Sequence, residues 1–208
     1  MKKRVKPKIK ETFPSKFEDL VEEEELYQRS FEKENYSDFS FHVSEWNECL
    51  FKNISFEDVN LKEIGIMDVV FCNCDFSNCN FENQAFYRAE FYDCKFVGVN
   101  FFKTNFYDCL FQDCNLDYSN FSDCKTKTCE FTDCQFREAR FHSNQISQTE
   151  WNHCDFSNLE LIETSMVGED VSSCNLEGLR TDPRNLKGMI ISREQSMDLI
   201  SIFGLIIR

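Results

Sequence analysis

A five-residue period of large apolar side chains constrains the fold of this chain more than any other feature. Stepping by five from Phe41 to Leu176 gives 28 positions, and 27 of them are large and apolar. Seventeen of the 23 phenylalanines lie on this single register, and no insertion interrupts it. The exception is Thr126, which has a lysine on each side. We expect looser packing around this polar residue, with water bonded to buried polar groups.

The cysteines follow the same period, two positions before the large residues. Eleven of the 12 cysteines occupy this phase, and only Cys72 lies outside it. The eleven are Cys49, Cys74, Cys79, Cys94, Cys109, Cys114, Cys124, Cys129, Cys134, Cys154 and Cys174. The other residues in this phase are mostly small or aliphatic, so the chain repeats one small and one large apolar residue in every five.

A period of five fits neither a helix nor a continuous strand. Five residues of α-helix advance about 500°, so successive phenylalanines would spiral around the helix axis. On a strand, an odd step sends every second side chain to the opposite face. The period is satisfied if the chain turns a corner once in every five residues and points both apolar residues inward. It therefore predicts a solenoid with a continuous core.

The pattern small–x–Phe/Leu–x–x resembles that of the pentapeptide repeat proteins. The resemblance implies an all-β fold, a right-handed quadrilateral β-helix with four pentapeptides, or 20 residues, in each coil. We assign residues 39–180 to this pentapeptide repeat solenoid. Residues 1–38 are expected to form a partly disordered N-terminal cap, and residues 181–208 a short C-terminal capping or dimerisation helix.

The repeat gives the cysteines a structural role. With 20 residues per coil, Cys74, Cys94 and Cys114 would stack about 4.8 Å apart, which is too far for a disulfide and too linear for a tetrahedral zinc site. We interpret them as small buried hydrophobic residues and expect no metal and no cofactor. Cys72 should point outward, and thiol redox sensing there is an alternative function of a different class.

Acidic residues gather on one side of the predicted solenoid. Residues 39–180 carry 24 acids and 10 bases, which accounts for the whole net charge of −14. Residues whose numbers differ by 20 should lie above one another on the same side of the solenoid. Grouping the charged residues in this way places 17 acids and 4 bases on two adjacent sides. We name as candidate partner-binding residues of this acidic flank Asp68, Asp75, Glu90, Asp93, Asp108, Asp113, Asp117, Glu130, Asp133, Glu150 and Asp155.

The C-terminal residues predict a helix with more apolar surface than a cap requires. Ser192 and Gln195 resemble a capping box, so a helix from about Arg193 to Phe203 should stop at Gly204, followed by a strand over 205–207. This additional apolar surface favours a two-fold homodimer through the C-terminal ends. The alternative is a monomer in which the helix serves only as a cap. The candidate dimerisation residues are Met197, Leu199, Ile200, Ile202, Phe203, Leu205, Ile206 and Ile207.

The unbroken repeats, the acidic flank and the ending REQSMDLISIFGLIIR are similar to the Qnr-type quinolone-resistance proteins of Gram-positive bacteria. This resemblance implies a homodimer that mimics DNA, binds a type II topoisomerase (DNA gyrase or topoisomerase IV) and protects it from quinolones. Qnr relatives from Gram-negative bacteria carry loops for which this register has no room. The alternative is a scaffolding solenoid for another protein.

Other classes of function lack support in the sequence. No catalytic motif or Gly-rich phosphate loop occurs, so we expect no enzyme. The acidic pI near 4.7 argues against direct binding of nucleic acid. The basic N-terminus has no apolar segment behind it, and the longest apolar stretch is far shorter than the roughly 20 residues of a membrane helix. We therefore expect a cytoplasmic protein without a membrane partner.

Overall fold

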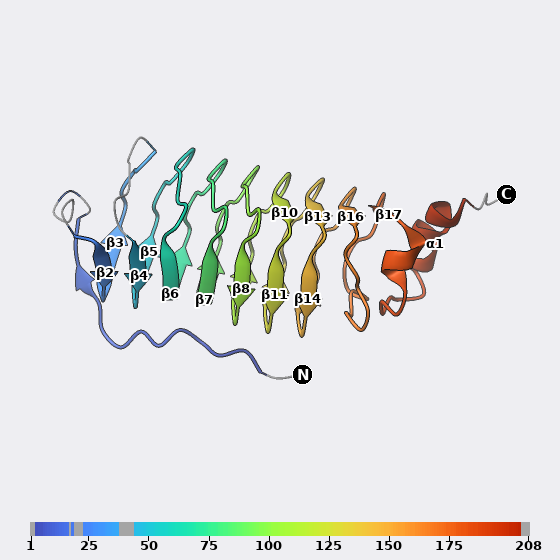
Figure 1. Ribbon diagram of the computed structural model, residues 1–208, viewed down its shortest axis with the longest axis horizontal. Helices are drawn as coiled ribbons and strands as arrows, with labels where there is room; N and C mark the ends of the chain where they lie inside the picture. Colours follow the sequence, from blue (N-terminus) through green and yellow to red (C-terminus); the bar gives the residue numbers. More distant parts are fainter. Residues whose placement is uncertain (1–2, 17, 19–22, 38–43, 205–208) are drawn as a thin grey trace.

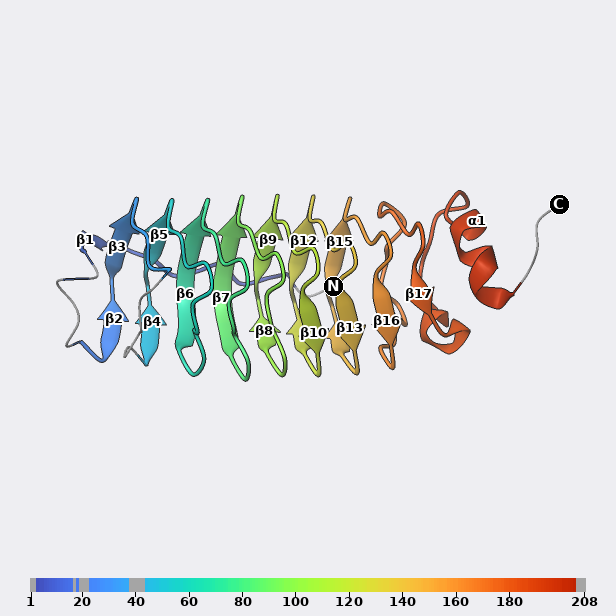
Figure 2. The same ribbon diagram turned by 90° about the horizontal axis from the view of Figure 1, so that it is seen from above.

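The protein is a rod-shaped β-solenoid of about eight coils (Figures 1 and 2). The computed structural model describes residues 3–16, 18, 23–37 and 44–204. At about 4.8 Å per coil, the stack is roughly 38 Å long. The strands lie across the long axis, and a short helical segment follows the last coil (Figure 1).

The chain turns a corner once in every five residues, as the period predicts. Two residues after each inward aromatic, the backbone takes a positive φ, for example 53° at Asn73 and 53° at Asp93. This left-handed conformation is uncommon for residues other than glycine, and Asn and Asp adopt it most readily. The corners thus explain why Asn and Asp recur at this phase.

Four corners per coil give the solenoid four faces, which we number 1 to 4 along the chain. Face 1 contains β2 (Glu25–Tyr27), β4 (Glu45–Asn47), the first halves of β6 (Gly65–Cys72) and β7 (Ala85–Tyr92), β8 (Asn105–Tyr107), β11 (Lys125–Lys127) and β14 (Gln145–Ser147). Face 2 contains β3 (Arg29–Glu32), β5 (Leu50–Lys52), the second halves of β6 and β7, β9 (Leu110–Gln112), β12 (Glu130–Thr132) and β15 (Glu150–Asn152).

Faces 3 and 4 complete the quadrilateral. Face 3 is held by isolated parallel bridges that join every twentieth residue from Asn35 to Asn175. Face 4 contains β10 (Asn120–Ser122), β13 (Arg140–His142), β16 (Glu160–Ile162) and β17 (Arg180–Thr181). All described pairs are parallel, and partners are mostly 20 residues apart, as in Phe71 opposite Phe91. The predicted quadrilateral β-helix with 20-residue coils is therefore confirmed.

Aromatic rings form columns through the core, one ring per coil. The column inside face 2 is unbroken, and its neighbouring rings are stacked at centroid distances between 4.5 and 5.1 Å. It consists of Phe31, Phe51, Phe71, Phe91, Phe111, Phe131 and Trp151. These rings are almost completely buried, so the phenylalanines of the period are the core of the solenoid.

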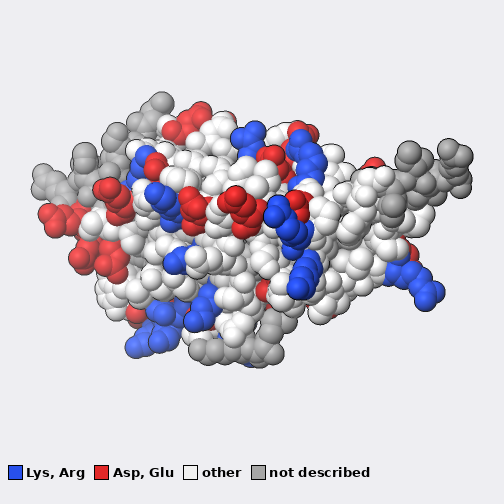
Figure 3. Space-filling view, turned by 45° about the vertical axis from the view of Figure 1, so that its right-hand side comes forward, with Lys and Arg blue, Asp and Glu red and all other residues white. Residues whose placement is uncertain are grey.

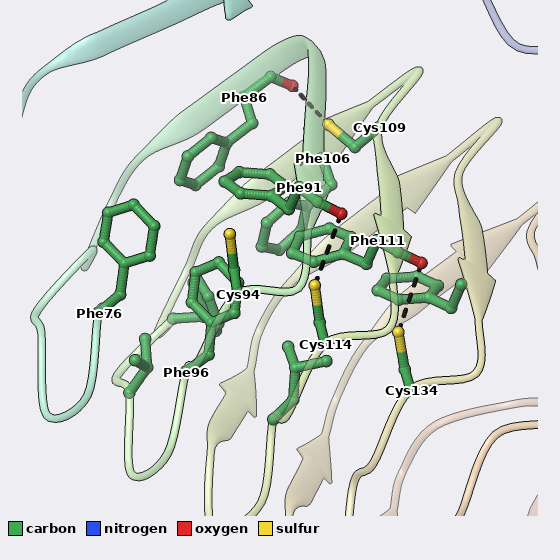
Figure 4. Close-up of a cluster of buried hydrophobic side chains, with 14 of the residues drawn as sticks. Phe76, Phe86, Phe91, Cys94, Phe96, Phe106, Cys109, Phe111, Cys114 and Cys134 are labelled. Atoms are coloured by element: carbon green, nitrogen blue, oxygen red, sulfur yellow. Dashed lines mark hydrogen bonds between the residues drawn. The ribbon is translucent and has the colours of Figure 1, made fainter. Parts of the chain in front are cut away.

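The buried cysteines do more than fill space. Each of the eleven in-phase cysteines is buried, and Cys72 is only half-buried, as the repeat predicts. Their thiols donate to the carbonyl oxygen 23 residues earlier, as in Cys114 Sγ to Phe91 O at 3.5 Å and Cys134 Sγ to Phe111 O at 3.3 Å (Figure 4). Burial raises the pKa of Cys124 to about 12, which keeps this thiol protonated and able to donate.

The polar break at Thr126 does not interrupt the stack. Strand β11 pairs with β8 on one side and with β14 on the other in the normal register. The Thr126 side chain is buried, and its hydroxyl lies 3.2 Å from that of Thr149. A threonine from the next coil thus donates a hydrogen bond to the buried Thr126 hydroxyl.

The N-terminal end of the solenoid lies earlier in the chain than the sequence predicts. Strands β2 and β3 pair with β4 and β5, so a coil begins at Glu25, inside the segment expected to be a cap. Strand β1 (Phe13–Pro14) pairs with β3 and covers the edge of this first coil. The five-residue register of large residues continues back through Leu26, Phe31 and Tyr36, all of them buried. Only the small-residue phase departs from the pattern, with Arg29 and Glu34 in place of small or aliphatic residues.

The C-terminal end is closed by a short helical cap. After the 3-10 turn η2 (Pro183–Leu186), a helical segment consists of α1 (Ser196–Leu199) and the 3-10 turn η3 (Ile200–Phe203). It begins three residues later than predicted, and Gly204 ends it with a φ of 68°. No helix among the described residues is both long and apolar enough to span a membrane.

The predicted capping box is present, and it also closes the last coil. The Ser192 amide donates to Gln195 Oε1 at 2.7 Å, and the Gln195 amide donates to Ser192 Oγ at 3.3 Å. The buried Gln195 side chain donates in addition to the carbonyl oxygens of Val171 and Cys174. One glutamine therefore provides donors for carbonyls that have no further coil to bind.

We expect Phe91→Ala to destabilise the protein by about 3–5 kcal/mol, because it leaves a cavity in the unbroken ring column. The matched control is Phe102→Ala, at a half-exposed position outside the columns, which should cost less than about 1 kcal/mol. Urea unfolding followed by circular dichroism measures both. Equal losses for the two variants would contradict the assignment of the period to the core.

Candidate protein-binding surface

The structure brings the eleven predicted acidic residues together on faces 2 and 3 and the corners beside them. Asp68 and Asp108 lie at the corner of faces 1 and 2, and Glu90, Glu130 and Glu150 lie on face 2. The remaining six lie further along each coil. Asp93, Asp113 and Asp133 occupy the corner of faces 2 and 3, and Asp75, Asp117 and Asp155 belong to face 3.

Asp93, Asp113 and Asp133 form an aspartate ladder, one residue per coil. All three are exposed, and coil spacing places them about 4.8 Å apart along the backbone stack. Each has a φ near 54°, so the corner conformation accounts for their residue type. Asn53 and Asn73 occupy the same corner in earlier coils. Because asparagine satisfies the corner equally well, the negative charge itself is not required by the fold.

Several other acids of the flank already have partners within the solenoid. Arg88 donates two hydrogen bonds of 2.6 and 2.7 Å to Asp68, and Arg137 binds Asp117 Oδ2 through Nη2 at 2.7 Å. Both carboxylates are buried, with 5% exposure each. Burial raises the pKa of Asp68, but its bonds to Arg88 and to the Lys8 amide outweigh this and hold it below the usual value.

A basic N-terminal segment covers another part of the flank, which the sequence analysis did not foresee. Residues 3–10, here called the strap, run in an extended conformation along the coils (Figure 1). Arg4 Nη1 lies 2.8 Å from Glu90 Oε1, and Arg4 Nε lies 3.7 Å from Glu130 Oε2. The sequence did contain one indication of this contact, because the first ten residues are basic and the flank is acidic.

The surface is therefore less uniformly acidic than the sequence count suggests. The view of Figure 3, which looks mainly at faces 1 and 4, shows acidic and basic side chains interleaved there, and basic groups also lie among the acids of the flank. Lys95 pairs with Asp75 at 3.3 Å, and His153 lies 3.7 Å from Asp133. Of the eleven candidate residues, the three of the aspartate ladder and Glu150 are exposed, whereas the other seven are buried or half-buried.

The candidate dimerisation residues divide between the core and the surface. Leu199 is buried against the last coil, and Ile202 packs partly against the core. Ile200 is half-buried. Met197 and Phe203 remain exposed, at 56% and 55%. Leu205, Ile206 and Ile207 lie outside the described residues.

Cys72 does not have the environment of an activated thiol. Its side chain is only half-buried, yet burial, followed by the nearby Cys94, raises its pKa above the usual value. A reactive cysteine has a lowered pKa, because the thiolate is the nucleophile. The thiol redox alternative thus gains no support from the surroundings of Cys72.

We expect Asp93→Ala to destabilise the protein by about 1 kcal/mol, because alanine adopts the left-handed corner less readily. Asp93→Asn should stay within about 0.5 kcal/mol of the original chain, and Asp93→Gly should also be tolerated. Thermal unfolding at constant salt separates the three. If Asp93→Asn costs as much as Asp93→Ala, the carboxylate has a structural role that we have not assigned.

Comparison with known proteins agrees with this geometry. Residues 84–150 match the family model of the pentapeptide repeat region. HetL from the cyanobacterium Nostoc sp. strain PCC 7120, a pentapeptide repeat protein involved in heterocyst differentiation regulation, superposes with a TM-score of 0.58 at 12% identity. The match covers 81% of this chain and 83% of HetL.

A more distant structural match is the plasmid-mediated fluoroquinolone resistance protein QnrB1. Its trypsin-treated form gives a TM-score of 0.42 at 18% identity, covering 89% of this chain and 90% of QnrB1. No curated protein sequence matches the chain significantly. Residues 84–150 therefore match a pentapeptide repeat region, and the five-residue period and 20-residue coils extend beyond it to give the chain the same fold as the solved structure of HetL.

Proposed function

We propose that this chain is a non-enzymatic protein-binding solenoid that imitates the charge of duplex DNA and binds a type II topoisomerase, DNA gyrase or topoisomerase IV. The observation that carries the proposal is the exposed aspartate ladder, which repeats a negative charge in three successive coils of a rigid rod. A duplex likewise presents a regular series of negative charges to its protein partners. Protection of the enzyme from quinolones would follow from competition with bound DNA.

The fold suits such a role because the charges are fixed in position. Each aspartate is held at a corner whose backbone is bonded to the next coil, as in the Asp93 amide donating to Gln112 O at 3.0 Å. Charges that are already held in place lose little conformational entropy when a partner binds, and this favours affinity. A basic DNA-binding groove would meet them with complementary charge, and this complementarity speeds association.

The ladder can be tested without disturbing the fold, because asparagine keeps the corner. We expect the triple variant Asp93→Asn, Asp113→Asn and Asp133→Asn to lose at least about tenfold in potency in gyrase supercoiling assays with and without ciprofloxacin. This loss reflects weaker charge complementarity. The effect of the original chain should also weaken as salt rises.

A matched control lies at the diagonally opposite corner, between faces 4 and 1. Glu63→Gln, Asp123→Asn and Glu163→Gln remove the same charge from three exposed corner residues, and this variant should retain full potency. If both triple variants act equally, or if the original chain neither inhibits nor protects at micromolar concentration, the topoisomerase proposal is wrong.

A scaffolding role for another protein is the second candidate. It is favoured by the internal neutralisation of the flank, where Arg88 and Arg137 bind Asp68 and Asp117 directly. A scaffold would use the shape of the rod more than its charge. Binding of its partner should therefore change little with salt or with the asparagine triple variant.

We further propose a homodimer through the C-terminal cap, where Met197 and Phe203 are exposed. Met197→Glu with Phe203→Glu should shift the chain to a monomer in sedimentation equilibrium, because charges would be buried in the interface. The control is Val167→Glu, which changes an exposed apolar residue at 64% exposure on the last coils. A chain that is monomeric before substitution would refute the dimer.

A further inference from the structure

The strap fits the repeat of the coils beneath it. The Val5 amide donates to Asp108 Oδ1 at 3.1 Å, and the Lys8 amide donates to Asp68 Oδ1 at 3.0 Å. The two acceptors are two coils apart, about 9.6 Å. Three residues of extended chain span about 10 Å. The Val5 and Lys8 amides, three residues apart in an extended segment, thus reach two carboxylates of this corner.

The side chains of the strap match the same repeat by charge. Arg4 lies between Glu90 and Glu130, which are also two coils apart, and the Arg4 and Glu90 side chains are each only 10% exposed. This ion pair is largely withdrawn from water, in contrast to ordinary surface pairs. The fit therefore involves backbone, charge and burial together.

The strap is nevertheless held differently from the coils. Among the described residues, backbone-to-backbone hydrogen bonds between the N-terminal segment and the coils begin at Phe13. Residues 3–10 are held by carboxylate acceptors and by the ion pairs of Arg4. Such contacts weaken with salt and can be replaced by another basic chain without unfolding a coil.

We propose that the corner of faces 1 and 2, with Asp68, Asp108, Glu90 and Glu130, is a track for an extended basic peptide. The strap is its resident ligand, and an extended basic segment of a protein partner binds there by displacing the strap. The inference rests on the proposed function only for the identity of that partner. Glu90 and Glu130 of the track lie on face 2, and the aspartate ladder follows the far corner of this face, so a partner that spans face 2 must move the strap.

The first experiment measures the strap in the full chain by hydrogen exchange. The Val5 and Lys8 amides should be protected about tenfold or more over an unstructured peptide, and the protection should disappear near 1 M salt. It should also be lost in a variant with Arg4→Glu and Lys8→Glu. A control with Lys103→Glu and Lys187→Glu, both exposed, has the same charge change and should keep it.

Two exchange results would overturn the proposal. Unprotected amides in the original chain would mean that the strap is not seated on the track. Protection as strong as that of the Asp93 amide within the coils, and insensitive to salt, would mean that the segment is a permanent part of the fold and cannot be displaced.

The second experiment offers the track a ligand from outside. The probe is a fluorescent peptide with the sequence of residues 1–12, and a scrambled peptide of the same composition is its control. The Arg4→Glu, Lys8→Glu variant should bind the probe about tenfold more tightly than the original chain, whose track is occupied. The Lys103→Glu, Lys187→Glu variant should match the original chain. Equal binding by all three chains, or equal binding of the scrambled peptide, would refute the proposal.

A topoisomerase assay separates this inference from the proposed function. If both hold, the Arg4→Glu, Lys8→Glu variant inhibits or protects gyrase at a lower concentration than the original chain and its charge-matched control. If the probe binds as expected while gyrase responds to none of the chains, the topoisomerase proposal fails and the peptide track stands. If gyrase responds equally to the variant and its control, displacement of the strap by this partner is refuted.

Discussion

The in-register stacking of 20-residue coils is the constraint on which the rest of this structure depends. Each coil is hydrogen-bonded to the next through parallel backbone pairs. A residue therefore lies beside the residues 20 positions before and after it, which occupy the same position of the repeat. One phenylalanine therefore becomes a ring column, and one aspartate becomes a ladder. A residue type that recurs at one position of the repeat therefore forms a continuous row along the rod, whether it packs in the core or carries charge on the surface.

The corners connect fold and proposed function. A positive φ every fifth residue favours Asn, Asp or Gly, and the chain uses both Asn73 and Asp93 at one corner. The choice between them does not affect the turn, but it decides whether that corner carries charge. A surface charge pattern can therefore change from coil to coil without cost to the backbone, which makes such a solenoid well suited to present charges to a protein partner.

The buried thiols show that hydrogen bonding also shapes the core. Cys79 donates to Phe56 O, and Thr104 donates to Phe81 O, in the same geometry between coils. Cysteine serves here as an apolar side chain with a weak donor. Thr104 thus takes the place of cysteine in the inward phase with the same bond, whereas residues such as Ala89 and Val99 occupy this phase through packing alone.

The period of the sequence by itself determined the solenoid and the inward cysteines, and the 20-residue coil implied by the resemblance to pentapeptide repeat proteins then placed the acidic residues on their faces. This was possible because a strict period fixes which residues share a face once 20 residues make a coil. Only the tertiary structure decided which acids remain free. Pairs such as Asp68 with Arg88 join neighbouring coils, and the strap joins residues as distant as Val5 and Asp108. The strap has no repeat of its own, so its position depends on electrostatic and steric fit to a surface that exists only when the coils are stacked.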